Sequence, residues 1–123
     1  MTALVKLTEV IKKYISPADA PDVEVLKGVS LEIATAERVG IVGPSGSGKS
    51  TLLNIIGALD TASEGTVMFG DKDLNVLTED ELAAFRANQV GFVFQLHHLL
   101  PQCTVYENVL LPTIPSGGER DVV

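Results

Sequence analysis

The sequence predicts an α/β fold in which extended segments come first and a strand, a glycine-rich loop and a helix follow. Residues 4–14 alternate apolar and polar side chains, as a half-buried strand does, and residues 23–33 resume an extended pattern. A short apolar segment at 38–42 then leads through the loop into a helical pattern over 51–59. These three observations predict sheet and helix in one domain.

The remaining elements follow from turn residues and periodicity. In chain order they are a loop at 15–22, a turn at 34–37, a turn at 61–65, a short strand at 66–70, a helix from about 79 to 88, a strand at 90–94 that ends at Gln95, and one or two helical turns at 105–111. Thr78 and Glu81 have the spacing of a capping box at the helix start. The core candidates of the second extended segment are Val25, Leu26, Val29, Leu31 and Ile33.

Composition excludes several classes of function. The chain has 123 residues, 46% of them hydrophobic, which is enough for one domain with a modest core. Its formal net charge of −7 gives no electrostatic support for binding nucleic acid or anionic lipid. Cys103 is the only cysteine, so no internal disulfide forms, and no segment has the length of a signal peptide or a membrane helix. We therefore expect a soluble intracellular chain.

The glycine-rich loop has the spacing of a phosphate-binding loop, which is Gly, four residues, Gly, Lys, then Ser or Thr. Its residues are Gly43, Pro44, Ser45, Gly46, Ser47, Gly48, Lys49 and Ser50. The glycines allow backbone N–H groups to surround an anion, Lys49 suits the β and γ phosphates, and Ser50 suits Mg²⁺. The helix that follows directs its positive end toward the phosphates. The alternative is a surface turn, which the strand before and the helix after make less favourable.

A dinucleotide site is a poor fit to the same loop. The fingerprint Gly-x-Gly-x-x-Gly requires a third glycine, and counting from Gly46 and Gly48 that place holds Thr51. A nicotinamide or flavin fold is therefore not expected.

Taken together, these segments resemble the nucleotide-binding subunit of ATP-binding cassette transporters, over residues 4–112. Four features carry the resemblance: Tyr14, where the family places an aromatic that stacks on adenine; residues 25–31; the loop with its continuation to Leu53; and the 91–95 segment ending in Gln95. Residues 57–60, 97–101 and 107–109 look most like the branch that serves lipoprotein release and macrolide efflux.

The resemblance implies a partial P-loop NTPase core with an N-terminal antiparallel β subdomain, binding ATP and Mg²⁺. The implied nucleotide-binding residues are Tyr14, Gly43, Pro44, Ser45, Gly46, Ser47, Gly48, Lys49, Ser50 and Thr51; the implied catalytic residues are Lys49 and Gln95; and the implied Mg²⁺ ligands are Ser50 and Gln95. It also implies a membrane-embedded permease partner, a homodimer of ATP-binding domains, and a cytoplasmic position at the inner membrane.

The chain lacks other parts that the resemblance implies. No apolar strand ending in Asp-Glu and no switch histidine can be placed after Gln95. Residues 116–120 resemble the family signature, although Pro115 stands where the family usually has Leu. We therefore interpret residues 1–123 as a shortened, truncated ATP-binding domain that is inactive alone. The 38–42 strand is then expected to be exposed, because the strands that flank it in the family are missing. The open alternative is a non-catalytic nucleotide-binding or interaction module, and a small kinase is a weaker third.

Several single residues also have ordinary structural interpretations. Tyr14 fits a plain strand aromatic, and Gln95 fits a solvent-facing strand end. His97 and His98 are adjacent, a poor spacing for two metal ligands, so we expect them in the loop that meets the permease. Cys103 is expected to be a small buried apolar residue.

Overall fold

A computed structural model describes residues 3–114, and the chain divides into two compact units, residues 1–78 and 79–123. The predicted signature remnant at 116–120, with Pro115 before it, lies outside the described residues. Within the described residues no helix has the length and apolar character needed to cross a membrane.

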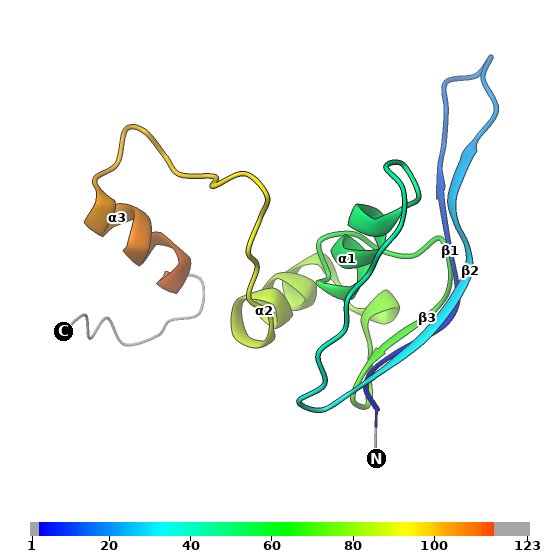
Figure 1. Ribbon diagram of the computed structural model, residues 1–123, viewed down its shortest axis with the longest axis horizontal. Coiled ribbons are helices and arrows are strands. Elements are labelled where there is room, and N and C mark those ends of the chain that lie inside the picture. The colour runs from blue at the N-terminus through cyan, green and yellow to red at the C-terminus, as the bar shows by residue number, and fades with distance from the viewer. Residues whose placement is uncertain (1–2, 115–123) are drawn as a thin grey trace. The chain divides into compact units, whose positions relative to one another are not determined.

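The first unit contains a four-stranded antiparallel sheet with the strand order β2-β1-β3-β4. The strands are β1 (Ala3–Tyr14), β2 (Val23–Ala34), β3 (Glu64–Phe69) and β4 (Lys72–Asp73). Figure 1 shows β1 and β2 as a long hairpin with β3 on the other side of β1. The predicted strands at 4–14, 23–33 and 66–70 are confirmed, and so is an antiparallel N-terminal sheet.

A β-bulge at Glu9 changes which side chains of β1 face the core. Between the pairs Leu7↔Leu31 and Val10↔Val29, β1 contains one residue more than β2, and Glu9 has a positive φ of 48°. An extra residue in one strand shifts its alternation by one position. Leu7 and Val10 are therefore both buried, although strict alternation would place them on opposite faces.

The helix α1 (Lys49–Ile56) follows the glycine-rich loop and contacts β2. It ends at Ile56, earlier than the predicted 59, with Gly57 as its cap; the Ala58 N–H then donates to the Ile55 carbonyl, and Ala58 leaves the helix with φ +60°. A 3₁₀ turn at Leu74–Val76 follows β4. The buried hydrophobic side chains of this unit are Val5, Leu7, Val10, Leu26, Leu52, Ile55, Ala58, Val67 and Leu74. Of the five predicted core residues of β2, only Leu26 is fully buried.

The prediction of a buried strand at 38–42 is wrong. No strand pairs with these residues anywhere in the described part of the chain, and Val42 is 92% exposed. A strand is stable only when its backbone groups bond to a neighbour, and the sheet of this unit ends with β2 at one edge and β4 at the other. An apolar composition alone therefore does not make this segment a strand.

The second unit contains α2 (Glu79–Gln89), α3 (Val105–Leu110) and a 3₁₀ turn at Leu111–Thr113. The predicted helices at 79–88 and 105–111 are confirmed. Leu82 and Phe85 are the buried residues of α2. Thr104 and Glu107 form a reciprocal capping box at the start of α3, with N···O distances of 3.0 and 3.1 Å.

The prediction of a strand at 90–94 is also wrong. Residues 91–94 have no ladder partner among the described residues and are exposed. The rings of Phe92 and Phe94 instead stack on each other, with centroids 5.4 Å apart, and the His98 ring meets Phe94 edge-on at 4.6 Å. The alternating aromatic residues that predicted a strand thus make ring contacts with each other and with His98.

Candidate functional site

The predicted phosphate loop is a tight turn followed directly by α1. Ser47 N–H donates to the Pro44 carbonyl at 3.2 Å, and Gly46 between them has φ +80°. A positive φ at the third position of such a turn favours glycine. The first bond of the helix runs from Leu52 N–H to the Gly48 carbonyl, so the N–H groups of Lys49, Ser50 and Thr51 have no acceptor within the helix. This is the arrangement that binds an anion.

Gly48 sets how closely the loop approaches the sheet. It has φ +97°, and a Cβ placed on it would lie 3.0 Å from Leu26 Cδ2 and 3.1 Å from Val25 Cγ1. Only a residue without a side chain fits this position at this backbone angle. The loop is therefore packed against β2, and its N–H groups are held in place by the sheet.

Lys49 extends over the loop that precedes it. Its Nζ donates to the carbonyls of Gly43 and Pro44, the latter at 3.0 Å. The ammonium group thus lies at the loop while one of its three donors remains for another acceptor. A phosphate on the loop would meet both backbone N–H groups and this positive charge.

Tyr14 lies at the end of β1 and is held by polar contacts. Its hydroxyl donates to Asp60 Oδ2 at 3.3 Å, and Lys12 Nζ lies over the ring at 5.2 Å from the centroid. Lys12 Nζ also donates to Asp60 Oδ1 at 3.0 Å and to the Thr61 carbonyl at 2.7 Å. Tyr14 as a whole remains 43% exposed. Sequence reasoning identified Tyr14 but missed Lys12 and Asp60.

The carboxylate of Asp60 is stabilised in its charged form. Partial burial alone raises the pKa of Asp60, but the hydrogen bond and charge of Lys12, with bonds from Thr61 N–H and Tyr14, outweigh it. The net pKa of Asp60 lies below its ordinary value. Asp60 is therefore an anion at neutral pH, paired with the Lys12 cation.

A cavity of about 490 Å³ lies along β2 beside the phosphate loop. Its lining residues are Val23, Glu24, Val25, Leu26, Lys27, Val29, Gly46 and Ser47. Val23 is the ladder partner of Tyr14, and directly opposed residues of an antiparallel pair share one face of the sheet. The cavity is thus lined by Gly46 and Ser47 of the predicted phosphate loop and by Val23, the ladder partner of Tyr14.

Gln95 lies in the second unit, at a bend after α2, and its side chain is exposed. The strand predicted to carry it is absent in the described residues, as noted above. Its assigned roles toward Mg²⁺ and the attacking water stay predictions. All the other predicted site residues, Tyr14 and Gly43 to Thr51, lie in the first unit.

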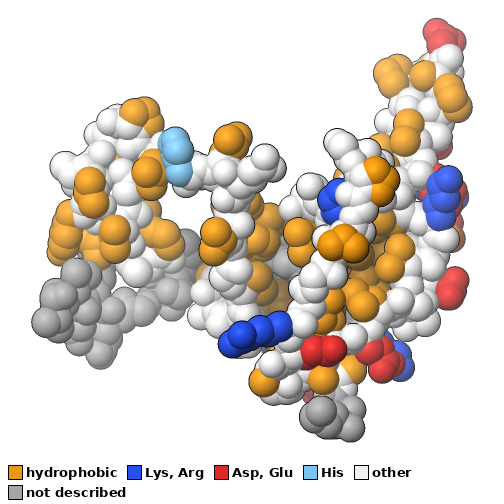
Figure 2. All heavy atoms as spheres, in the orientation of Figure 1, with side chains coloured by type: hydrophobic (Ala, Val, Ile, Leu, Met, Phe, Trp, Pro, Cys, Tyr) orange, Lys and Arg blue, Asp and Glu red, His pale blue; other side chains and the backbone are white. Residues whose placement is uncertain are grey.

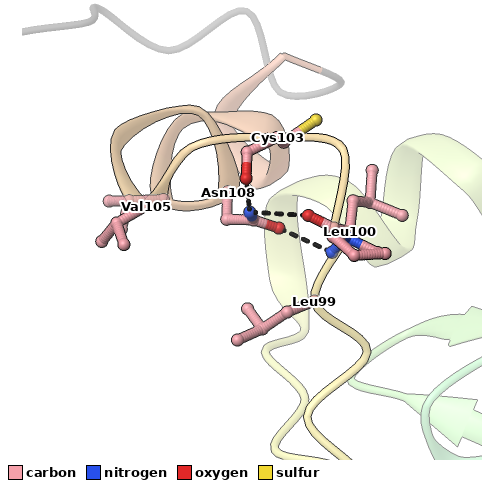
Figure 3. Close-up of a pocket in the computed structure, with 7 residues that line it drawn as sticks. Leu99, Leu100, Cys103, Val105 and Asn108 are labelled. Carbon is pink, nitrogen blue, oxygen red and sulfur yellow. Dashed lines mark hydrogen bonds between the residues drawn. The ribbon is translucent and has the colours of Figure 1, made fainter.

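A second cavity, of about 340 Å³, lies within the second unit between α3 and the loop before it (Figure 3). Asn108 ties that loop to the helix: its Oδ1 accepts from Leu100 N–H at 2.9 Å, and its Nδ2 donates to the carbonyls of Leu100, Cys103 and Thr104. Cys103 lines the cavity and is half-buried, so the expectation of a buried cysteine is wrong.

Hydrophobic side chains lie open on the surface of the same segment, as Figure 2 shows around α3. Val105 is 83% exposed, and Tyr106 and Val109 are 60% and 62% exposed. His97 and His98 precede this segment, and His97 Nδ1 accepts from Leu99 N–H at 3.0 Å.

Known proteins match this chain over nearly its whole length. Residues 26–122 match the family model described as ABC transporter. The macrolide export ATP-binding/permease protein MacB of Shigella flexneri is 49% identical over 120 residues, which cover 98% of this chain and 18% of that protein. The lipoprotein-releasing system ATP-binding protein LolD of Geobacter metallireducens is 45% identical over 120 residues, covering 98% of this chain and 52% of that protein.

A solved structure of an ATP-binding cassette has the same fold as this chain. An ATP-binding cassette in a dimeric post-hydrolysis state, bound to ADP and phosphate, superimposes with a TM-score of 0.85 at 45% identity. The match covers 97% of this chain and 50% of that one. The chain thus spans about half the length of this structure and of the lipoprotein-releasing relative. On this evidence the chain belongs to the ABC transporter family and has the α/β fold of its ATP-binding cassettes.

Proposed function

We propose that this chain binds ATP with Mg²⁺ and that the protein of which it is part couples ATP hydrolysis to export across a membrane. One observation carries the nucleotide-binding part of the proposal. The loop from Gly43 to Ser50 leads into helix N-terminal N–H groups that have no acceptor within the helix, carries the Lys49 ammonium, and helps to line a cavity along β2 through Gly46 and Ser47.

We assign a contacting protein group to each part of the nucleotide. The phosphates bind the N–H groups of Gly46 to Thr51 and the Lys49 ammonium. Tyr14 supplies an aromatic face for the base. Ser50 is exposed in the first turn of α1, and its hydroxyl is the hard oxygen ligand that Mg²⁺ accepts beside phosphate oxygens. Gln95 is the second proposed ligand of the metal. Bound Mg²⁺ would neutralise charge on the phosphates.

The relatives support the wider assignment. Their names describe macrolide export and lipoprotein release, and solved relatives are described as dimeric. By analogy we infer a homodimer of ATP-binding domains that works with a membrane-embedded permease on the cytoplasmic side. Either a lipoprotein or a macrolide-like drug is a suitable exported substrate.

The experiment is isothermal titration of the chain with ATP and Mg²⁺, compared with its Lys49→Ala variant. A charge-assisted hydrogen bond contributes about 1.5–3 kcal/mol, so we expect affinity to fall by about 10- to 150-fold. Lys72→Ala is the matched control, because Lys72 is an exposed lysine of the two-residue strand β4 and should leave affinity unchanged. Equal affinities of the native chain and the Lys49 variant would refute the proposal.

A further inference from the structure

We propose that Lys12 and Asp60 are positioning residues that hold the Tyr14 ring for the nucleotide base and connect it to the helix that carries the phosphate loop. This inference rests on the nucleotide-binding function proposed above. It concerns how the base end of the site is built, and the contacts that carry it all lie within the first unit.

The bulge at Glu9 is what brings the two side chains together. Residues two apart in a strand lie on the same face, so Val10, Lys12 and Tyr14 face one side of β1. Val10 is completely buried, so this is the core side of the strand. Without the extra residue, Lys12 and Tyr14 would face the opposite side and would not reach Asp60.

Lys12 is placed unlike an ordinary surface lysine. Its side chain is only 12% exposed, whereas the neighbouring Lys13 is 42% exposed and lies 3.8 Å from Glu64 in a loose ion pair. Burying a lysine is costly unless its charge is paired. The two acceptors of Lys12, Asp60 Oδ1 and the Thr61 carbonyl, supply that pairing while the ammonium lies over the Tyr14 ring.

These contacts leave one part of Tyr14 for a ligand. The hydroxyl is bonded to Asp60, and one ring face is next to the Lys12 ammonium. The residue nevertheless remains 43% exposed. Two anchors therefore hold the ring in one orientation, so a base that stacks on its open face need not order it first.

Asp60 also belongs to the end of α1. Its own N–H and that of Leu59 both donate to the Asn54 carbonyl, at 3.2 and 2.8 Å, which fixes the turn after the helix. The other end of α1 begins at Lys49, in the phosphate loop. One helix thus connects the anchor of the base-stacking ring with the groups that bind phosphate.

The test compares ATP with inorganic tripolyphosphate, which has the phosphates but no base. The variants are Lys12→Met, which keeps the apolar stem, and Asp60→Asn, which keeps an acceptor oxygen. We expect each to weaken ATP binding about fivefold, the lower end of what a stacked base contributes, and to leave tripolyphosphate binding unchanged. Lys13→Met is the matched control and should change neither.

A second measurement follows the ring itself. The chain has two tyrosines and no tryptophan, so in a Tyr106→Phe background the tyrosine emission comes from Tyr14 alone. Its fluorescence anisotropy should fall in Lys12→Met and Asp60→Asn and stay constant in Lys13→Met. A merely structural effect on stability would not alter the anisotropy of the folded chain in this selective way.

The outcomes separate this inference from the proposed function. Unchanged ATP affinity in both variants would overturn it, and so would equal weakening of ATP and tripolyphosphate, because the pair would then support the whole loop. Failure of the native chain to bind either ligand would refute the proposed function. In that case the anisotropy decides: a selective fall supports the positioning role, and no change overturns it.

Discussion

Substitution of Gly65 by alanine should destabilise the first unit more than any other single methyl group added to its sheet. Gly65 lies in β3 with φ +90°, opposite the bulge of β1. A Cβ there would lie 2.4 Å from the Glu9 carbonyl oxygen and 2.7 Å from that of Thr8. Both are backbone atoms in the bulge, so neither can move without breaking the ladder.

The magnitude follows from three terms. A positive φ costs alanine about 1–2 kcal/mol, and forcing a methyl group into packed backbone costs about 1–3 kcal/mol. Alanine returns about 0.4–1 kcal/mol by restricting the unfolded chain. We expect the free energy of unfolding of Gly65→Ala to fall by about 1–4.5 kcal/mol. Gly70→Ala is the control: φ is +60°, but no atom lies within 4 Å of the added Cβ, so the backbone and unfolded-chain terms apply and the packing term does not.

Urea unfolding of the two variants measures the difference, read from the midpoint and slope of each transition. In a Tyr106→Phe background, Gly65→Ala should also lower the anisotropy of Tyr14, because the bulge directs that ring. Equal losses of stability in Gly65→Ala and Gly70→Ala would refute the reasoning, since they would show that the bulge tolerates a methyl group at its closest contact.

Four other outcomes follow from the structure. ATP and GTP should bind with affinities within about tenfold, because the Tyr14 hydroxyl is already bonded to Asp60 and the ring offers the base only a face; competition titration would reveal any larger preference. The stability difference between the native chain and Asp60→Asn should be full at neutral pH and shrink below about pH 4. The pKa of Asp60 is lowered in the fold, so the ionised carboxylate stabilises the fold and this contribution is lost as acid protonates it; urea midpoints across pH check this. The chain of residues 1–123 should release phosphate from ATP no faster than its Lys49→Ala variant; a phosphate-release assay measures the two rates directly. Asn108→Ala should speed amide exchange at Leu100, because that N–H loses its acceptor; exchange at the rate of the native chain would contradict this.

Local patterns determined much of this protein. The spacing from Gly43 to Ser50 predicted the tight loop and the helix after it, because glycine angles and helix starts depend on adjacent residues. The extended segments that form β1 and β2 and the helices α2 and α3 were predicted from local apolar patterns, while the antiparallel pairing was implied by the family resemblance. The helices are stabilised by bonds between residues near in sequence, whereas β1 and β2 pair residues that are 9 to 31 positions apart, from Tyr14↔Val23 to Ala3↔Ala34.

Contacts between distant residues decided the rest. The apolar segments at 38–42 and 90–94 have the composition of strands, but a strand also needs a partner whose position no local pattern records. The bulge depends on Gly65 meeting Glu9, and the pairs of Asp60 with Lys12 and Tyr14 span 48 and 46 residues. Sequence alone therefore determined that a phosphate loop and an aromatic residue are present. The tertiary structure decided which way the aromatic ring faces and what holds it, because the direction of a strand side chain depends on the register of its neighbours.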